Sequence, residues 1–226
     1  GSIGTTLDLI IGSTSGTFNG KIDETSIFNY ALSSAQILEI YNNGKPKDLS
    51  TFSGTAPVSW WRLGENAYFD NNSFIVPNSI SGAPNGTGSG TIASMLSADA
   101  PGTYANGVGS NLDIVDRVGD APLSVANSQS YNMIPSNINP YVPAYVGNQV
   151  ANNFSMTFDG INDYFDTGDA FTSLSSFSIS AWFKSNDTVS VAQSIISSRT
   201  GSISASQGID IYISGNQLVG RVYNNG

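Results

Sequence analysis

The carboxylates are the side chains of this sequence that could most readily do chemistry, and their spacing argues against glycoside hydrolysis. That reaction needs two carboxyl groups about 5 to 9 Å apart, one on each side of the bond that breaks. The sequence has only three glutamates, Glu24, Glu39 and Glu65. Asp23 precedes Glu24 directly, and adjacent residues of a strand point to opposite faces. We therefore expect no catalytic carboxylate pair and predict that the protein is not an enzyme.

Two residue types that many enzymes need are absent. The sequence contains neither cysteine nor histidine. This excludes disulfides, thiolate and imidazole metal sites, and nucleophilic catalysis that depends on a histidine base. The absences strengthen the prediction that the protein is not an enzyme.

A run of aspartates in "DGINDYFDTGD" superficially resembles a metal-binding loop. Asp159, Asp163, Asp166 and Asp169 lie close together in the sequence, but the glutamate that closes an EF-hand loop is missing. Asp and Asn beside Gly are also the residues that hairpin turns require. We favour structural turns for this run.

One short helix is predicted after the opening strands. Residues 1–31 alternate in part between apolar and polar positions, as strands do. Ser33 and Gln36 then form a capping box, and Gly44 is suited to the position just after a helix. The apolar residues of the helix recur at helical spacing: Ile37, Ile40 and Tyr41. A helix of about ten residues must be held by packing this face on a sheet.

Short strands are predicted in the rest of the chain. Trp60 and Trp61 should point to opposite faces of an extended segment, so only one of them can face a given core. From Asn153 onward, short apolar segments are separated by turn residues at even spacing, the pattern of an antiparallel sandwich. The stretch at about 97–152 has little pattern, and we interpret it as a long insertion.

Composition limits the partners of the protein. The net charge is −9, and only eight Lys and Arg residues are scattered along the chain, so nucleic acid is not expected as a partner. No run of about 18 apolar residues occurs, so no membrane insertion is expected. Low charge with many Ser, Thr and Asn residues is typical of proteins of the cell exterior or the virion surface.

Three motifs resemble the laminin-G-like, concanavalin-A-like family of jelly-roll domains, which includes lectins and glucanases. "NGKIDETSIFNYALSSAQILEIYNNG" is similar to the closing strand and helix of that family. "WWRLGEN" with "VPNSISGAPNGTG" resembles the first strand and its loop, and "FSMTFDGINDYFDTGD" with "SFSISAWFKS" resembles the early strands. The variant of the first strand with paired tryptophans and "RLGE" resembles the one in tandem copies of the domain in marine-phage and bacterial surface proteins. The resemblance implies an all-β, antiparallel jelly-roll β-sandwich with one short helix.

The order of these motifs implies parts of two tandem repeats. Residues 1–48 resemble the C-terminal part of one repeat, residues 49–56 are a polar linker, and residues 57–226 resemble the N-terminal part of a second repeat. Residues 1–44 could alternatively complete the second copy as a circular permutant, since jelly-roll termini often lie close together.

The same resemblance implies a calcium site and a function. In the family, a calcium ion often lies between the loop after the first strand and an Asp of the last strand. This places the ligands at Asp23, Glu65 and Asn78, where the family usually has Asp at the last position. The alternative is that Glu65 is a surface residue, Asn78 a turn residue and Asp23 a partner of a backbone N–H.

We expect a non-catalytic recognition or adhesion module in a repetitive extracellular, cell-surface or virion protein. Its partners would be a glycan, a surface protein or neighbouring repeats of the same protein. Two alternatives stay open: a structural spacer in a fibre and, more weakly, a glycoside hydrolase or its accessory domain. The catalytic members of the superfamily carry a Glu-x-Asp-x-(x)-Glu motif on one strand, and this sequence lacks it.

Overall fold

The computed structural model describes residues 8–12, 16–70, 72–97, 113–115, 122–124, 154–168, 174–186, 192–198 and 208–223. Most of the expected insertion at about 97–152 lies outside these residues. Within it, only one short antiparallel pair of strands is described, β8 (Asp113–Val115) and β9 (Pro122–Ser124).

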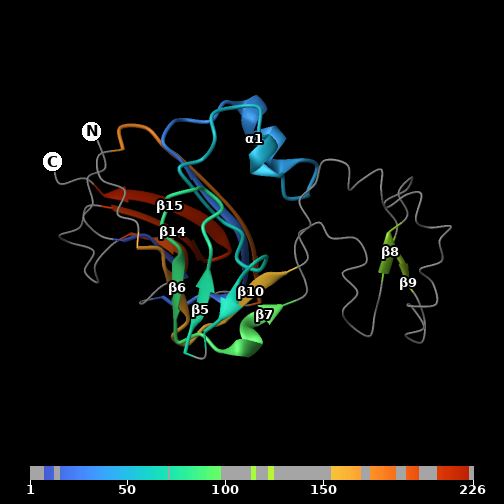
Figure 1. The fold of residues 1–226 in the computed structure, drawn as a ribbon, viewed down its shortest axis with the longest axis vertical. Coiled ribbons are helices and arrows are strands. Elements are labelled where there is room, and N and C mark those ends of the chain that lie inside the picture. The colour runs from blue at the N-terminus through green and yellow to red at the C-terminus, as the bar shows by residue number, and fades with distance from the viewer. Residues whose placement is uncertain are drawn as a thin grey trace.

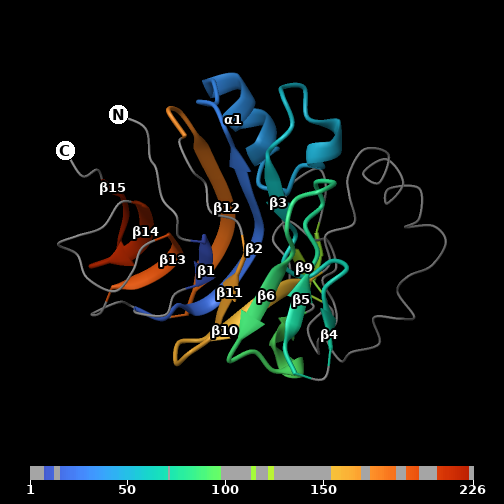
Figure 2. The ribbon, with the colours of Figure 1, turned by 60° about the vertical axis from the view of Figure 1, so that its left-hand side comes forward.

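Two antiparallel sheets form the body of the protein (Figure 1, Figure 2). The larger sheet has eight strands in the spatial order β15 (Gln217–Tyr223), β14 (Gly208–Ser214), β13 (Gln193–Ser197), β1 (Ile10–Gly12), β11 (Tyr164–Asp166), β6 (Gly86–Ser89), β5 (Phe74–Val76) and β4 (Tyr68–Phe69). The smaller sheet has five strands: β12 (Ser178–Ser185), β2 (Asn19–Phe28), β10 (Ser155–Asp159), β7 (Leu96–Ser97) and β3 (Ser59–Trp61), which pairs with β2. The protein is therefore an all-β sandwich with one α-helix in its described part.

The N-terminal strands lie in the middle of both sheets. In the larger sheet, β1 lies between β13 and β11, and in the smaller sheet β2 lies between β12 and β10. Strands β1 and β2 thus pair with strands that the sequence assigns to the second repeat, as a permuted arrangement requires. The assignment of segments to two repeats stays a prediction.

Apolar side chains fill the space between the sheets, and a second cluster lies on the outer face of the smaller sheet. The inter-sheet core includes Ile22, Ile27, Trp61, Phe158 and Phe165. The outer cluster is formed by Phe28, Ile40, Leu49 and Trp60. Trp60 and Trp61 therefore point to opposite faces, as predicted, and both are buried because the outer face is also covered.

The helix α1 (Ser34–Tyr41) and the 3-10 helix η1 (Leu49–Thr51) cover part of this outer face. A second 3-10 helix, η2, spans Ala93–Met95. The predicted capping box is confirmed, because the Ser33 side chain accepts the Gln36 N–H and the Gln36 side chain accepts the Ser33 N–H. The helix is shorter than predicted. Asn42 adopts the left-handed conformation and ends it two residues before Gly44.

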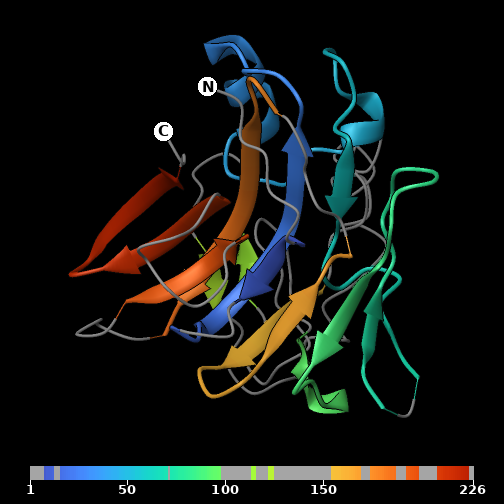
Figure 3. The same ribbon diagram turned by 90° about the vertical axis from the view of Figure 1, so that its left-hand side faces the viewer.

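The two sheets differ in extent on one side. Figure 3 shows β14 and β15 reaching beyond β12, the edge strand of the smaller sheet. Among the described strands, none pairs with the outer edge of β12.

Candidate functional site

Strand β2 changes partners where its carboxylates occur. One of its edges pairs with β10 through Asn19–Ile22 and with β3 through Thr25–Ile27, so Asp23 and Glu24 pair with neither strand. On the opposite edge, β2 has one more residue than β12 between the paired positions, which is a β-bulge. Glu24 has a left-handed φ of 49° and is the extra residue. The bulge and the gap between β3 and β10 together open a space beside Asp23 and Glu24.

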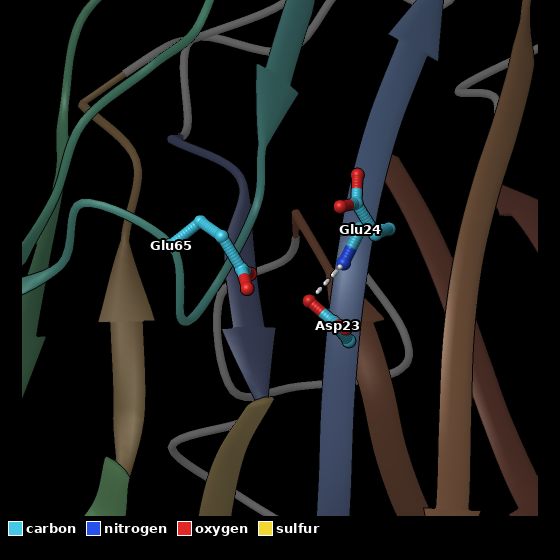
Figure 4. A group of neighbouring side chains, drawn as sticks. All are labelled: Asp23, Glu24 and Glu65. Carbon is cyan, nitrogen blue, oxygen red and sulfur yellow. Dashed lines mark hydrogen bonds between the residues drawn. The ribbon is translucent and has the colours of Figure 1, made fainter. Parts of the chain in front are cut away.

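Glu65 enters this space from the loop after β3 (Figure 4). Asp23, Glu24 and Glu65 each place a carboxylate oxygen within 4.8 Å of the others. The expectation that Asp23 and Glu24 point to opposite faces of the strand was therefore wrong. It assumed strict alternation, which the bulge interrupts.

Glu24 is held in a buried ion pair. Its Oε1 accepts a hydrogen bond from Arg62 Nε at 3.0 Å, and its Oε2 accepts one from Trp60 Nε1 at 2.5 Å. The Glu24 side chain is buried, and this burial raises the pKa of its carboxyl to about 7 against the opposing effect of Arg62 and Trp60. Near neutral pH, Glu24 is therefore divided between its charged and neutral forms.

Asp23 and Glu65 each accept a backbone N–H. Asp23 Oδ1 accepts the N–H of Glu24 at 2.8 Å, and Glu65 Oε1 accepts the N–H of Phe154 at 3.0 Å. Calcium binds oxygen at 2.3–2.6 Å, so two ligands of one ion lie up to about 5 Å apart, which fits the spacing of these carboxylates. Arg62 opposes a cation here, although its charge is directed at Glu24.

Asn78, the third expected ligand, has a structural role. Its Oδ1 accepts the backbone N–H groups of Trp60 and Ile80, both at 3.0 Å, and its Nδ2 donates to the carbonyl of Pro84. Two backbone donors already use the oxygen that would bind a metal. The structure thus brings Asp23 and Glu65 together, whereas Asn78 forms a β-bridge with Trp61 and holds two backbone N–H groups; a ligand role for Asn78 stays a prediction.

The aspartates around the β10–β11 turn and at the end of β11 also hold backbone groups. Asp163 Oδ2 accepts the Asp159 N–H, Asp159 Oδ1 accepts the Ile161 N–H, and Asp166 Oδ1 accepts the Gly168 N–H. These contacts agree with the turn interpretation for three of the four residues. Asp169 lies outside the described residues.

A groove between α1 and β12 is the second notable site, and it was not predicted. Its volume is about 490 Å³, and its lining consists of Leu32, Ile37, Ile40, Tyr41 and the five consecutive residues Ser178–Trp182. The predicted apolar face of α1 is only partly buried: Ile40 is covered, whereas Ile37 and Tyr41 are more than half exposed. Tyr41 stacks on Trp182, with ring centroids 6.0 Å apart. Alternation in "SISAW" indicated a strand, but nothing in it indicates that this strand lies at an edge.

Known proteins offer no independent assignment for either site. None of the helices in the described part of the chain has the length and apolar character that a membrane crossing needs. No protein-family model, curated protein or solved structure matches the chain.

Proposed function

We propose that the protein is a non-catalytic recognition or adhesion module of a repetitive extracellular, cell-surface or virion protein, and that it binds a glycan or a protein partner. The observation that carries this proposal is the open groove between α1 and β12. An accessible concave surface bordered by an exposed tyrosine, Tyr41, that stacks on Trp182 is what a binding module requires, and a spacer has no need of it.

The carboxylate cluster supports a non-catalytic role. A glycosidase needs two carboxyl groups about 5 Å or more apart on either side of a bound sugar. Asp23 is 1% exposed and Glu24 is 5% exposed, so a sugar ring has no access to them. Arg62 further engages Glu24 in an ion pair. These features are typical of a structural cluster rather than of a hydrolytic site.

The test compares two tyrosines of equal exposure. Tyr41 in the groove and Tyr68 on β4 are each 53% exposed. Labelled protein is applied to a glycan array and to a surface that carries the same protein. We expect binding in one of the two assays, at least about tenfold weaker for Tyr41→Ser and unchanged for Tyr68→Ser. Absence of binding in both assays would favour the spacer, and equal losses for the two variants would place the site elsewhere.

We also propose that Asp23 and Glu65 are ligands of a calcium ion, which would connect the loop after β3 to β2. A cation that binds only the folded state raises the melting temperature by mass action. We expect the wild-type chain to melt several degrees higher in millimolar calcium than in EDTA, and Asp23→Asn to lose this difference. Equal melting temperatures of the wild type in the two solutions would refute calcium binding while leaving the groove proposal intact.

A further inference from the structure

Exposed apolar side chains gather on one side of the molecule. Ten large hydrophobic side chains are exposed in the described part of the chain, and six of them lie on α1, β12 and β15: Ile37, Leu38, Tyr41, Phe183, Leu218 and Val222. Single exposed apolar residues are ordinary, whereas a contiguous group marks an interaction surface. The concentration on one side therefore needs a physical explanation.

On β15, the exposed residues belong to the core-facing side of the sheet. Leu218 lies opposite Ile213 and Val222 lies opposite Ile209, and directly paired residues of antiparallel strands share a face. Ile209 and Ile213 are buried, but Leu218 is 61% exposed and Val222 is 54% exposed. The inner face of the larger sheet thus continues beyond the cover that the smaller sheet provides (Figure 3).

Figure 2 and Figure 3 show β14 and β15 on the side of β12 that faces away from β2, so the uncovered region lies toward the unpaired edge of β12. The groove is lined by five consecutive residues of this strand, so it follows the backbone edge rather than one face. Among the described residues, none that lines it is charged. The groove therefore complements an uncharged extended strand, which would hydrogen-bond to β12 and lie between α1 on one side and β15 on the other.

We propose that the occupant is β12 of a second copy of this chain, paired antiparallel with the first across a two-fold axis. This proposal rests on the proposed function and identifies one partner for the same surface. Residues Ser178–Phe183 are uncharged, and the inner face of β12 carries Ile179, Ala181 and Phe183. The strand itself therefore has the chemistry that the groove requires, as a self-complementary interface must.

The two-fold axis fixes the register. Directly opposite residues of an antiparallel pair must share a face. The two-fold axis must therefore place one residue of β12 opposite the same residue of the second copy. With Ala181 on the axis, the smallest inner residue meets its own copy, and Ile179 lies opposite Phe183 of the second copy. Lys184 then lies opposite Ser178, which keeps the two lysines at opposite ends of the interface.

The size of the interface suits a weak dimer. In this register seven residues of each strand, Ser178–Lys184, are paired and extend for about 24 Å, and the layers of helix and two sheets span roughly 20 Å. The contact is then roughly 500 Å² for each copy, or about 1,000 Å² in total, near the lower limit of specific interfaces. We expect reversible association with a dissociation constant on the order of micromolar.

Sedimentation velocity of the full chain over a range of concentrations tests this association. We expect a monomer–dimer equilibrium in the wild type and at least tenfold weaker association in Val222→Lys. Ile161→Lys is the matched control, because Ile161 is an exposed apolar residue in the turn between β10 and β11, and β2 separates β10 from β12. A wild type that stays monomeric, or equal effects of the two lysines, would overturn the proposal.

Cross-linking tests the register. The chain has no native cysteine, so Ala181→Cys introduces a single thiol. Opposite Cα atoms of an antiparallel pair lie about 4.5 to 5.5 Å apart, within the range of a disulfide. We expect oxidation to give a covalent dimer of Ala181→Cys but not of Ser81→Cys, whose thiol lies on an exposed turn. Equal cross-linking of both variants would refute the register.

The outcomes separate this inference from the proposed function. If the wild type is monomeric but its binding to the glycan array is sensitive to Tyr41→Ser, the dimer is refuted and the recognition module stands. If both experiments are negative, both proposals fail.

Discussion

Two regions beside strand β2 and its neighbour β12 reverse the usual distribution of polar and apolar side chains. Where β3 and β10 part, the structure buries Asp23, Glu24 and Arg62. Along β12, it leaves Tyr41 and Phe183 exposed. Buried charge and exposed apolar surface are the two informative exceptions to ordinary burial. In the first region, an ion pair and backbone hydrogen bonds offset the cost of removing the charges from water. In the second region, the apolar surface stays available to a partner.

The largest expected effect comes from breaking the buried ion pair. Arg62→Met leaves Glu24 buried beside Asp23 and Glu65 without its guanidinium partner. We expect a loss of about 3 to 5 kcal/mol in the free energy of unfolding at about pH 9, where Glu24 is ionised in the folded wild type, measured by urea denaturation. Lys47→Met is the control, because Lys47 pairs with Glu39 at the surface at 3.4 Å and such pairs contribute about 0 to 1 kcal/mol. Similar losses in both variants would contradict the proposed contrast.

Stability should also depend on pH through Glu24. The pKa of the Glu24 carboxyl is about 7 in the folded protein, against an ordinary value of 4.5 that applies to the unfolded chain. The folded state therefore holds the proton more tightly. The resulting stabilisation is fully present below about pH 4.5 and is lost as pH rises to about 7. The difference of the two pKa values corresponds to about 3 kcal/mol. Glu24→Gln should remove this fall while keeping an acceptor for Trp60.

Urea denaturation of the wild type and Glu24→Gln at a series of pH values measures this difference. Other carboxyl groups titrate in both proteins, so only the difference between the two curves reports on Glu24. Parallel curves between about pH 4.5 and 7 would show that Glu24 is fully ionised in the folded protein throughout that range.

The sequence predicted those features that depend on local rules. Alternation placed Trp60 and Trp61 on opposite faces, and the capping box of Ser33 and Gln36 placed the start of α1 correctly. Turn chemistry predicted the roles of Asp159 and Asp163. Each of these features is determined within a few residues of the chain.

The features that prediction missed depend on contacts between distant segments. The bulge at Glu24 brings two adjacent carboxylates together, and a left-handed glutamate has no local signal. The spacing of Ile22 and Ile27 was an indirect sign of the bulge. They are five residues apart and both reach the inter-sheet core, which an uninterrupted strand does not allow. The meeting of Glu65 with β2 depended on the loop after β3 and was expected only from the resemblance.

A smaller effect should follow from uncapping the helix that borders the groove. Ser33→Ala removes the acceptor of the Gln36 N–H at the start of α1. We expect a loss of about 1 kcal/mol, the typical cost of a lost N-cap, measured by thermal or urea unfolding. Ser33→Asp keeps an acceptor at the cap and should retain most of the stability. A loss in Ser33→Asp equal to that in Ser33→Ala would show that the cap does not hold the helix.

The smallest effect should come from the exposed side of β15, and it depends on protein concentration. Val222→Ser removes an apolar side chain that is 54% exposed in one copy, so we expect a change below about 0.5 kcal/mol in dilute protein. Ile209→Ser on the same face is the comparison, since burial of Ile209 should make it cost several kcal/mol at every concentration. If a second copy covers β15, the cost of Val222→Ser should grow as the protein is concentrated, because association stabilises only the wild type. A cost that stays small at every concentration would leave Val222 without a partner and would make the contrast between the two regions a property of the monomer alone.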